Sequence, residues 1–163
     1  MTRRIQADDA PQLLLMNNAA VPAVNELDEA ALDDILEHCH LALAVVDDAE
    51  PGTVLGFVVT FIAGAAYASE NYRWFEARSS DFLYVDRIVV GEGFRGRRLG
   101  QVLYSAVFAA ARDAARAEVL CEVNLEPPNP GSLAFHGRLG FSEVGRQATK
   151  GGTVVVSLMA ARV

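Results

Sequence analysis

Cysteine is scarce in this chain of 163 residues, which contains only Cys39 and Cys121. Two cysteines are too few for a disulfide-stapled scaffold, and neither has a partner at metal-ligand spacing. The three histidines also lack convincing ligand spacing, so we expect no metal site. This usage favours a reducing compartment and a cytoplasmic protein.

Long apolar runs are also missing. No run approaches the ~18 residues that a membrane-spanning helix needs, and the stretch Val54 to Ala68 is interrupted by glycines and a threonine. The first residues, Met1 to Arg4, are followed by acidic positions rather than by an apolar signal-peptide core. We therefore expect no membrane partner.

Basic residues are few, and the formal net charge is −7. This charge argues against nucleic acid as a partner, because electrostatic attraction to phosphates dominates such binding. The charge is unevenly distributed, since residues 1–80 carry thirteen acids and four bases while residues 81–163 carry eight acids and ten bases. Three of those bases, Arg95, Arg97 and Arg98, lie within four residues. The cluster is either a solvated turn or an anion site in an otherwise acidic protein.

Hydrophobic residues make up 52% of the chain, which is enough for a sizeable core. The length suits one domain, 1–163. Residue patterning predicts an α/β fold with a mixed sheet, hairpins near both ends and one β-α-β crossover in the middle. The expected strands cover Arg4–Ala7, Leu41–Val46, Val54–Ile62, Phe82–Val90, Val119–Val123, Phe141–Arg146 and Thr153–Met159.

Helix signals are equally clear. Asp8 and Asp28 are expected N-caps, the first helix is expected to break at Asn17 and Asn18, and residues 63–80 are expected to be irregular. A longer amphipathic helix is predicted from Arg98 to Arg116 and a short one from Gly131 to Leu139.

The strongest chemical signal is the segment Val90-Gly91-Glu92-Gly93-Phe94-Arg95-Gly96-Arg97-Arg98-Leu99-Gly100-Gln101. A strand runs into a basic, glycine-bearing turn that opens a helix, and the free amides of a helix N-terminus bind phosphates. The segment matches neither GxxxxGK[ST] nor GxGxxG, which disfavours nucleoside triphosphates and dinucleotides.

Two motifs in order resemble the GNAT superfamily of acetyl-CoA-dependent N-acetyltransferases. Arg95-Gly96-Arg97-Arg98-Leu99-Gly100 resembles its acetyl-CoA signature [Q/R]-x-x-G-x-[G/A]. Residues 129–141, Asn-Pro-Gly-Ser-Leu-Ala-Phe-His-Gly-Arg-Leu-Gly-Phe, resemble its second motif, N-x-x-[A/S]-x-x-x-Y-x-x-x-G-F. The resemblance implies a mostly antiparallel sheet with splayed central strands, flanked by about four helices. Arg98 replaces a usual glycine of the first motif, and His136 replaces the usual tyrosine of the second.

The resemblance also implies a site. Acetyl-CoA, as co-substrate, would be held by residues of the fourth strand, of the phosphate loop and of the second motif: Ile88, Val89, Val90, Arg95, Gly96, Arg97, Arg98, Leu99, Gly100, Gln101, Asn129 and Ser132. His136 either protonates the leaving thiolate or only packs against the cofactor. Glu122 and Asp86 are the main candidates for the general base, and Glu126 is a third.

The acceptor would be a small-molecule amine or a peptide N-terminus, lying against Asn25, Tyr72, Trp74 and Tyr84. Two other functions stay open at this stage. One is a non-catalytic acyl-CoA-binding module, and the other is a toxin that acetylates aminoacyl-tRNA, which the net charge disfavours. Residues Val154 to Leu158 offer an edge for a homodimer.

Overall fold

The protein is built on one seven-stranded sheet with the strand order β1-β2-β3-β4-β5-β7-β6. The computed structural model describes residues 1–163. The strands are β1 (Thr2–Arg4), β2 (Leu41–Val46), β3 (Val54–Phe61), β4 (Phe82–Val90), β5 (Glu118–Glu126), β6 (Ser142–Thr149) and β7 (Val154–Arg162). The helices are α1 (Ala10–Ala19), α2 (Glu29–His38), α3 (Glu70–Arg78), α4 (Leu99–Asp113) and α5 (Pro130–Arg138). The expected α/β fold with a largely antiparallel sheet is confirmed, with five helices instead of about four.

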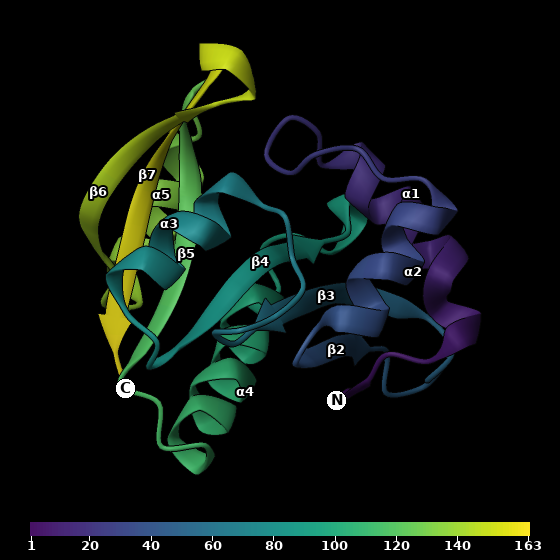
Figure 1. Ribbon diagram of the computed structural model, residues 1–163. Helices are drawn as coiled ribbons and strands as arrows, with labels where there is room; N and C mark the ends of the chain where they lie inside the picture. Colours follow the sequence, from purple (N-terminus) through teal and green to yellow (C-terminus); the bar gives the residue numbers. More distant parts are fainter.

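The centre of the sheet is split. β4 and β5 form its one parallel pair, and they are paired only from Phe82–Glu118 to Tyr84–Leu120. Beyond these residues the two strands diverge, while β4 stays paired with β3 and β5 stays paired with β7. Figure 1 shows the sheet opening into two halves at this point. The expected splay of the central strands is therefore present.

Helices cover both faces of the sheet (Figure 1). On the α1–α3 face, Leu13, Leu32 and Tyr72 pack on the strand residues Phe57 and Tyr84. All five side chains are almost completely buried. The apolar stripe of α2 faces this core, and its N-terminus is capped by Asp28, which accepts a hydrogen bond from the Ala31 amide at 2.8 Å, as expected.

The opposite, α4–α5 face is covered mainly by α4. Its residues Leu103 and Val107 pack on Val58, Leu83 and Val119 of the sheet. The 3.6-residue period of the apolar positions after Leu99 is the reason that α4 lies flat on this face. α5 adds partly buried apolar side chains at the same layer.

Five sequence expectations about local structure were wrong. Asp8 caps no helix, since Gln6 precedes the 3₁₀ turn and Asp9 precedes α1. Residues 154–158 belong to β7, which lies between β5 and β6 and so offers no sheet edge. The first strand lies at Thr2–Arg4, and residues 7–9 form a 3₁₀ turn before α1. α1 continues through Asn17, because that side chain is buried and bonded to the Asn25 carbonyl at 2.9 Å instead of competing for its own backbone. Residues 70–78 form α3, which is capped by Ser69 and anchored by buried Tyr72 and Phe75.

Candidate active site

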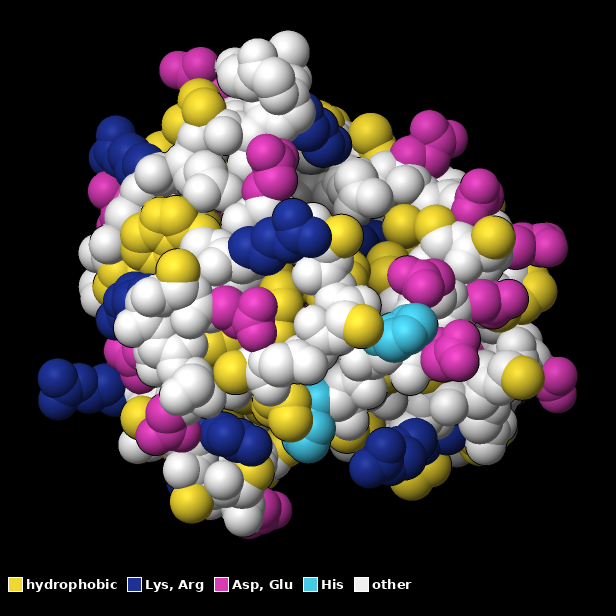
Figure 2. Space-filling view, viewed as in Figure 1, with side chains coloured by type: hydrophobic (Ala, Val, Ile, Leu, Met, Phe, Trp, Pro, Cys, Tyr) yellow, Lys and Arg dark blue, Asp and Glu magenta, His cyan; other side chains and the backbone are white.

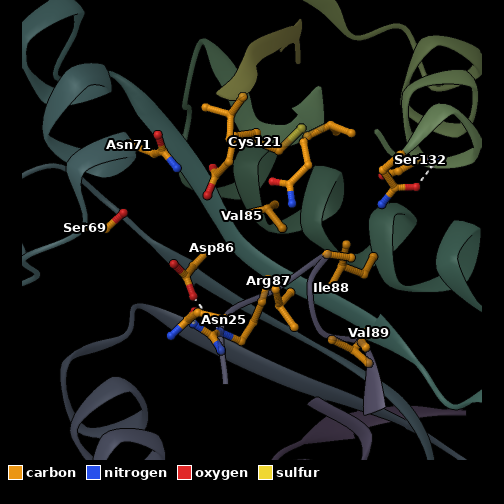
Figure 3. Close-up of a pocket in the computed structure, with 18 of the residues that line it drawn as sticks. Asn25, Ser69, Asn71, Val85, Asp86, Arg87, Ile88, Val89, Cys121 and Ser132 are labelled. Carbon is orange, nitrogen blue, oxygen red and sulfur yellow. Dashed lines mark hydrogen bonds and ion pairs between the residues drawn. The ribbon is translucent and has the colours of Figure 1, made fainter. Parts of the chain in front are cut away.

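A cleft of about 510 Å³ occupies the gap where β4 and β5 diverge. β4, β5, the α1–α2 loop, the start of α3, α5 and the β6–β7 turn all contribute to its walls (Figure 3). Of the residues expected to form the site, ten line it: Asn25, Asp86, Ile88, Val89, Val90, Arg95, Glu122, Asn129, Ser132 and His136. The split in the sheet therefore brings residues far apart in sequence into one cavity.

The cleft exposes strand backbone. Along residues 85–90 of β4 and 121–126 of β5, the outer side is paired with a neighbouring strand except at one bulged residue in each, and the side facing the cleft has no strand partner. Unpaired strand edges present N–H and C=O groups to any extended molecule that enters. This arrangement suits a linear, amide-bearing arm such as pantetheine.

The phosphate loop, which contains the basic residues Arg95, Arg97 and Arg98, lies at the N-terminus of α4, at one end of this gap. The amides of Gln101 and Val102 donate to the Arg98 carbonyl, so the helix proper begins there. The preceding amides, those of residues 96–100, have no acceptor within the protein. Together with the exposed Arg95 guanidinium they form a positive, donor-rich turn of the kind that binds pyrophosphate.

Two residues of the loop adopt left-handed backbone conformations. Gly96 has φ +80°, which glycine tolerates, and Arg98 has φ +61°. Arg98 is the position where the resembling signature has glycine, so the arginine takes up a glycine-like conformation at a steric cost. The remaining glycine, Gly100, is needed for close packing, since a Cβ there would lie 3.0 Å from the Phe135 ring.

Glu122 is the carboxyl group best placed for proton transfer. It lies on β5, and its Oε1 accepts a hydrogen bond from the Tyr84 hydroxyl at 2.9 Å. Its Oε2 is shielded from solvent and has no hydrogen-bond partner. Burial, and secondarily the charge of Asp86, raise the pKa of Glu122 to about 8. A carboxyl group with a free oxygen and a pKa near neutrality is suited to accept a proton.

Asp86 has a different environment. It is the extra residue of a β-bulge, because Val85 pairs with Thr60 and Arg87 pairs with Val59. In a regular strand, neighbouring side chains point to opposite faces, but the bulge lets Asp86 and Arg87 meet at 2.7 Å.

The Asp86 carboxylate is fully engaged in this network. Its second oxygen accepts from the Tyr67 hydroxyl, and Arg87 also donates to Asn17 and Asn25 at 2.9 and 3.0 Å. Figure 3 shows Asp86, Arg87 and Asn25 grouped on one wall. This network fixes the α1–α2 loop to β4 and leaves Asp86 with no free oxygen.

His136 lies on α5 and is 4% exposed. Its Nδ1 is 2.8 Å from the Ser132 carbonyl, and its Nε2 is 2.8 Å from the Tyr104 hydroxyl. Burial lowers its pKa, so the ring is neutral near pH 7. Asn129 caps the same helix by accepting from the Ser132 amide at 3.2 Å.

Three of the expected acceptor contacts are corrected by the structure. Tyr72 is fully buried, and its hydroxyl bonds to the Ile62 carbonyl and to Glu76, away from the cleft. Trp74 packs against Gly145 of β6, where a Cβ would lie 2.6 Å from the indole. Tyr84 does not line the cleft either, but it reaches the site indirectly through its hydrogen bond to Glu122.

Sequence reasoning missed Tyr67, Arg87 and Tyr104, which all line the cleft. Tyr67 lies in the segment that carried no periodic pattern, and the bulge that turns Arg87 inward has no sequence signature. Tyr104 does have one, because it is the single hydroxyl-bearing aromatic residue on the apolar stripe of α4.

The chain matches the sequence model of the Acetyltransferase (GNAT) family over residues 10–141. It belongs to the GNAT family of acetyltransferases. The match spans both the phosphate loop and the His136 motif, so the enzyme is an acyltransferase.

Solved structures agree in fold across the whole chain. Ard1 from Thermoplasma volcanium superposes with a TM-score of 0.80 at 16% identity, covering 100% of this chain and 97% of that one. The ribosomal-protein-S18-alanine N-acetyltransferase from Escherichia coli superposes with a TM-score of 0.74 at 17% identity, covering 100% of this chain and 93% of that one. YncA from Salmonella typhimurium, a putative acetyltransferase solved with acetyl-CoA, superposes with a TM-score of 0.71 at 17% identity, covering 99% of this chain and 92% of that one. Curated protein sequences gave no match. None of this protein's helices is both long and apolar enough to cross a membrane.

Proposed function

We propose that this acyltransferase moves the acetyl group of acetyl-CoA to a primary amine by direct attack of the amine on the thioester. The observation that carries the proposal is Glu122, a carboxyl group with a solvent-shielded, unpartnered oxygen beside two unpaired strand edges. Acetyl transfer to an amine needs a group that takes a proton next to the carbonyl carbon, and Glu122 supplies it.

The co-substrate fits the rest of the cleft. The free amides of residues 96–100 and the Arg95 guanidinium would hold its pyrophosphate. The backbone of residues 88–90 would pair with its pantetheine arm, and Asn129 and Ser132 would lie beside the thiol end. A backbone N–H of β4 near Ile88 would polarise the thioester carbonyl as charge develops on its oxygen.

The proton path follows from the pKa of Glu122. Near neutral pH most Glu122 carboxyls are protonated in the empty cleft, and a cationic amine arriving nearby favours the ionised form. The amine attacks in its neutral form, after its ammonium proton has gone to solvent. The carboxylate takes the second N–H proton as the C–N bond forms, and the C–S bond breaks with its electrons on sulfur. The Asp86 carboxylate, paired with Arg87 and Tyr67, holds the wall of the cleft in place.

The acceptor is a small-molecule amine or a peptide N-terminus. α2, beside the α1–α2 loop that lines the cleft, carries Glu29, Asp33, Asp34 and Glu37, and acidic side chains gather on that side of the molecule (Figure 2). A negatively charged surface raises the concentration of cationic amines around the protein. Two proteins with this fold are named ribosomal-protein-alanine N-acetyltransferases, which makes a protein or peptide amine a reasonable acceptor class.

The test is an acceptor screen with acetyl-CoA, in which free thiol and acetylated product are both measured. The panel contains alkylamines, polyamines, amino acids and peptides with free N-termini. We expect amine-dependent thiol release by the wild type and a loss of about 100-fold in Glu122→Gln. The matched control is Glu118→Gln on the same strand, which lies outside the cleft and should retain wild-type activity. Acetyl-CoA binding without acetylation of any amine would instead favour an acyl-CoA-binding module.

A further inference from the structure

Three buried side chains that can exchange protons lie together at the wall of the cleft. Tyr104 comes from α4, Cys121 from β5 and His136 from α5, and all three line the cleft. The Tyr104 hydroxyl is 2.8 Å from His136 Nε2, and the Cys121 thiol lies near it. Tyr104 is fully buried, so its hydroxyl depends on these two neighbours and on whatever fills the cleft.

The hydrogen bonds define where the protons are. A backbone carbonyl can only accept, so the 2.8 Å contact with the Ser132 carbonyl places the imidazole proton on Nδ1. His136 Nε2 therefore has a free lone pair and accepts the Tyr104 proton. A neutral His136 in this tautomer has no Nε2 proton to give, whereas Tyr104 carries one, which rotation about its C–O bond turns from His136 to an acceptor in the cleft.

The group that accepts the amine proton and the groups around the Tyr104 hydroxyl lie on opposite faces of the split sheet. Glu122 and Cys121 are neighbours on β5, so their side chains point to opposite faces. Glu122 meets Tyr84, which belongs to the core of the α1–α3 face, and Cys121 belongs to the core of the α4–α5 face. The phosphate loop is the N-terminus of α4, so the coenzyme arm reaches the gap from the face on which Tyr104 lies.

We propose that Tyr104 is the proton donor to the departing coenzyme A thiolate, and that His136 is a positioning residue that holds its hydroxyl. This assignment rests on the proposed acetyl transfer and names its second proton-transfer group. As the C–S bond breaks, sulfur keeps the electron pair and takes the phenolic proton, which leaves a thiol and a phenolate. The Cys121 thiol donates a hydrogen bond to that phenolate, and solvent returns the proton after the product leaves.

The chemistry of the three groups supports this division of roles. Burial raises the pKa of Tyr104 and of Cys121, so both stay protonated at neutral pH. Burial also makes a thiolate in the cleft more basic than in water, which improves the match with a phenol as proton donor.

The experiment compares the variants Tyr104→Phe, His136→Phe and the double variant in steady-state kinetics with acetyl-CoA and the best acceptor. We expect Tyr104→Phe to lower kcat about 100-fold, with the KM for acetyl-CoA changed less than about twofold. His136→Phe should lower kcat about tenfold, because the hydroxyl remains but loses its anchor. The double variant should be no slower than Tyr104→Phe alone, since both changes act on one proton. The control is Thr60→Val, which deletes another fully buried hydroxyl, one that bonds to the Leu41 carbonyl and does not line the cleft, and it should keep wild-type kcat.

A second measurement does not depend on activity. The ¹⁵N chemical shifts of His136 in the wild-type protein should report the Nδ1-protonated tautomer, and an Nε2-protonated ring would overturn the assignment. An unchanged kcat in Tyr104→Phe beside an active wild type would overturn the role of Tyr104 alone. A wild type that is inactive with every amine would overturn the proposed acetyl transfer, and this role with it.

Discussion

Glu122 gives the sharpest quantitative prediction, which concerns the pH dependence of acetyl transfer. Its pKa of about 8 means that roughly one-tenth of the free enzyme carries the carboxylate at pH 7 and roughly nine-tenths at pH 9. Because kcat/KM reports ionisations of the free enzyme and free substrate, it should rise about tenfold between these pH values. The source of the high pKa is burial, so the rise should persist in moderate salt.

The assay must distinguish the ionisation of Glu122 from that of the amine substrate, which also loses a proton as pH rises. We would measure kcat/KM from pH 6 to 10 with a series of acceptors of different amine pKa. The limb near pH 8 should stay in place across the series, while a second limb moves with the acceptor. In Glu122→Gln the fixed limb should vanish. A limb that follows the acceptor pKa throughout, or that survives in Glu122→Gln, would refute the assignment of Glu122 as base.

The same substitution has an expected effect on stability, with the sign fixed by linkage. The folded-state pKa of Glu122 lies above that of an unfolded glutamate, which is about 4.3. The folded protein therefore holds a proton that the unfolded chain loses between about pH 4 and 8, so this group makes the folded state less stable as pH rises through that range. Glu122→Gln should have a higher Tm than the wild type at pH 8, and the difference should shrink towards pH 5. A constant difference would show that the carboxyl is not perturbed in the folded state.

Three further substitutions probe the loop and the packing. Arg95→Ala should raise the Kd of acetyl-CoA about tenfold by calorimetry, because a charge-assisted contact to phosphate is lost, whereas Arg138→Ala on exposed α5 should not. Arg98→Gly should raise the Tm, because it removes a left-handed non-glycine residue that costs about 1 kcal/mol. It should leave the affinity for acetyl-CoA nearly unchanged, because the backbone amide remains. A lower Tm would show that Arg98 does not strain the loop. Gly145→Ala should lower the free energy of unfolding by about 1–3 kcal/mol, since its Cβ would lie 2.6 Å from the Trp74 ring. A urea midpoint equal to that of the wild type would show that the Trp74 side chain can move aside without cost.

The sequence predicts the frame of this protein well, because the frame rests on local signals. The strand Phe82–Val90 was expected with the bounds that the structure has, and the helix after the phosphate loop follows a sustained apolar period. α3 was missed because its helical signal is carried by one capping serine and two buried aromatic residues in a polar segment. Its stability comes from contacts with distant strands, which a local pattern does not contain.

The site was predictable in part for the same reason. Backbone-based binding by residues 96–100 depends on a local turn and can be read from glycine and arginine spacing. The roles of acidic side chains depend on tertiary neighbours. Asp86 and Glu122 were equal candidates from sequence, and they differ only because a bulge pairs Asp86 with Arg87 while Glu122 keeps one buried oxygen free. Tyr72 and Trp74 were expected at the acceptor site, but aromatic side chains fill cores as readily as they line pockets.

The most direct test of the account is a crystal structure of the protein with acetyl-CoA. The account predicts that the pyrophosphate lies on the amides of residues 96–100, that the pantetheine arm runs between β4 and β5, and that the thioester sulfur faces the Tyr104 hydroxyl with Glu122 across the carbonyl. Acetyl-CoA bound outside the gap between β4 and β5, or with its thioester remote from both side chains, would contradict it.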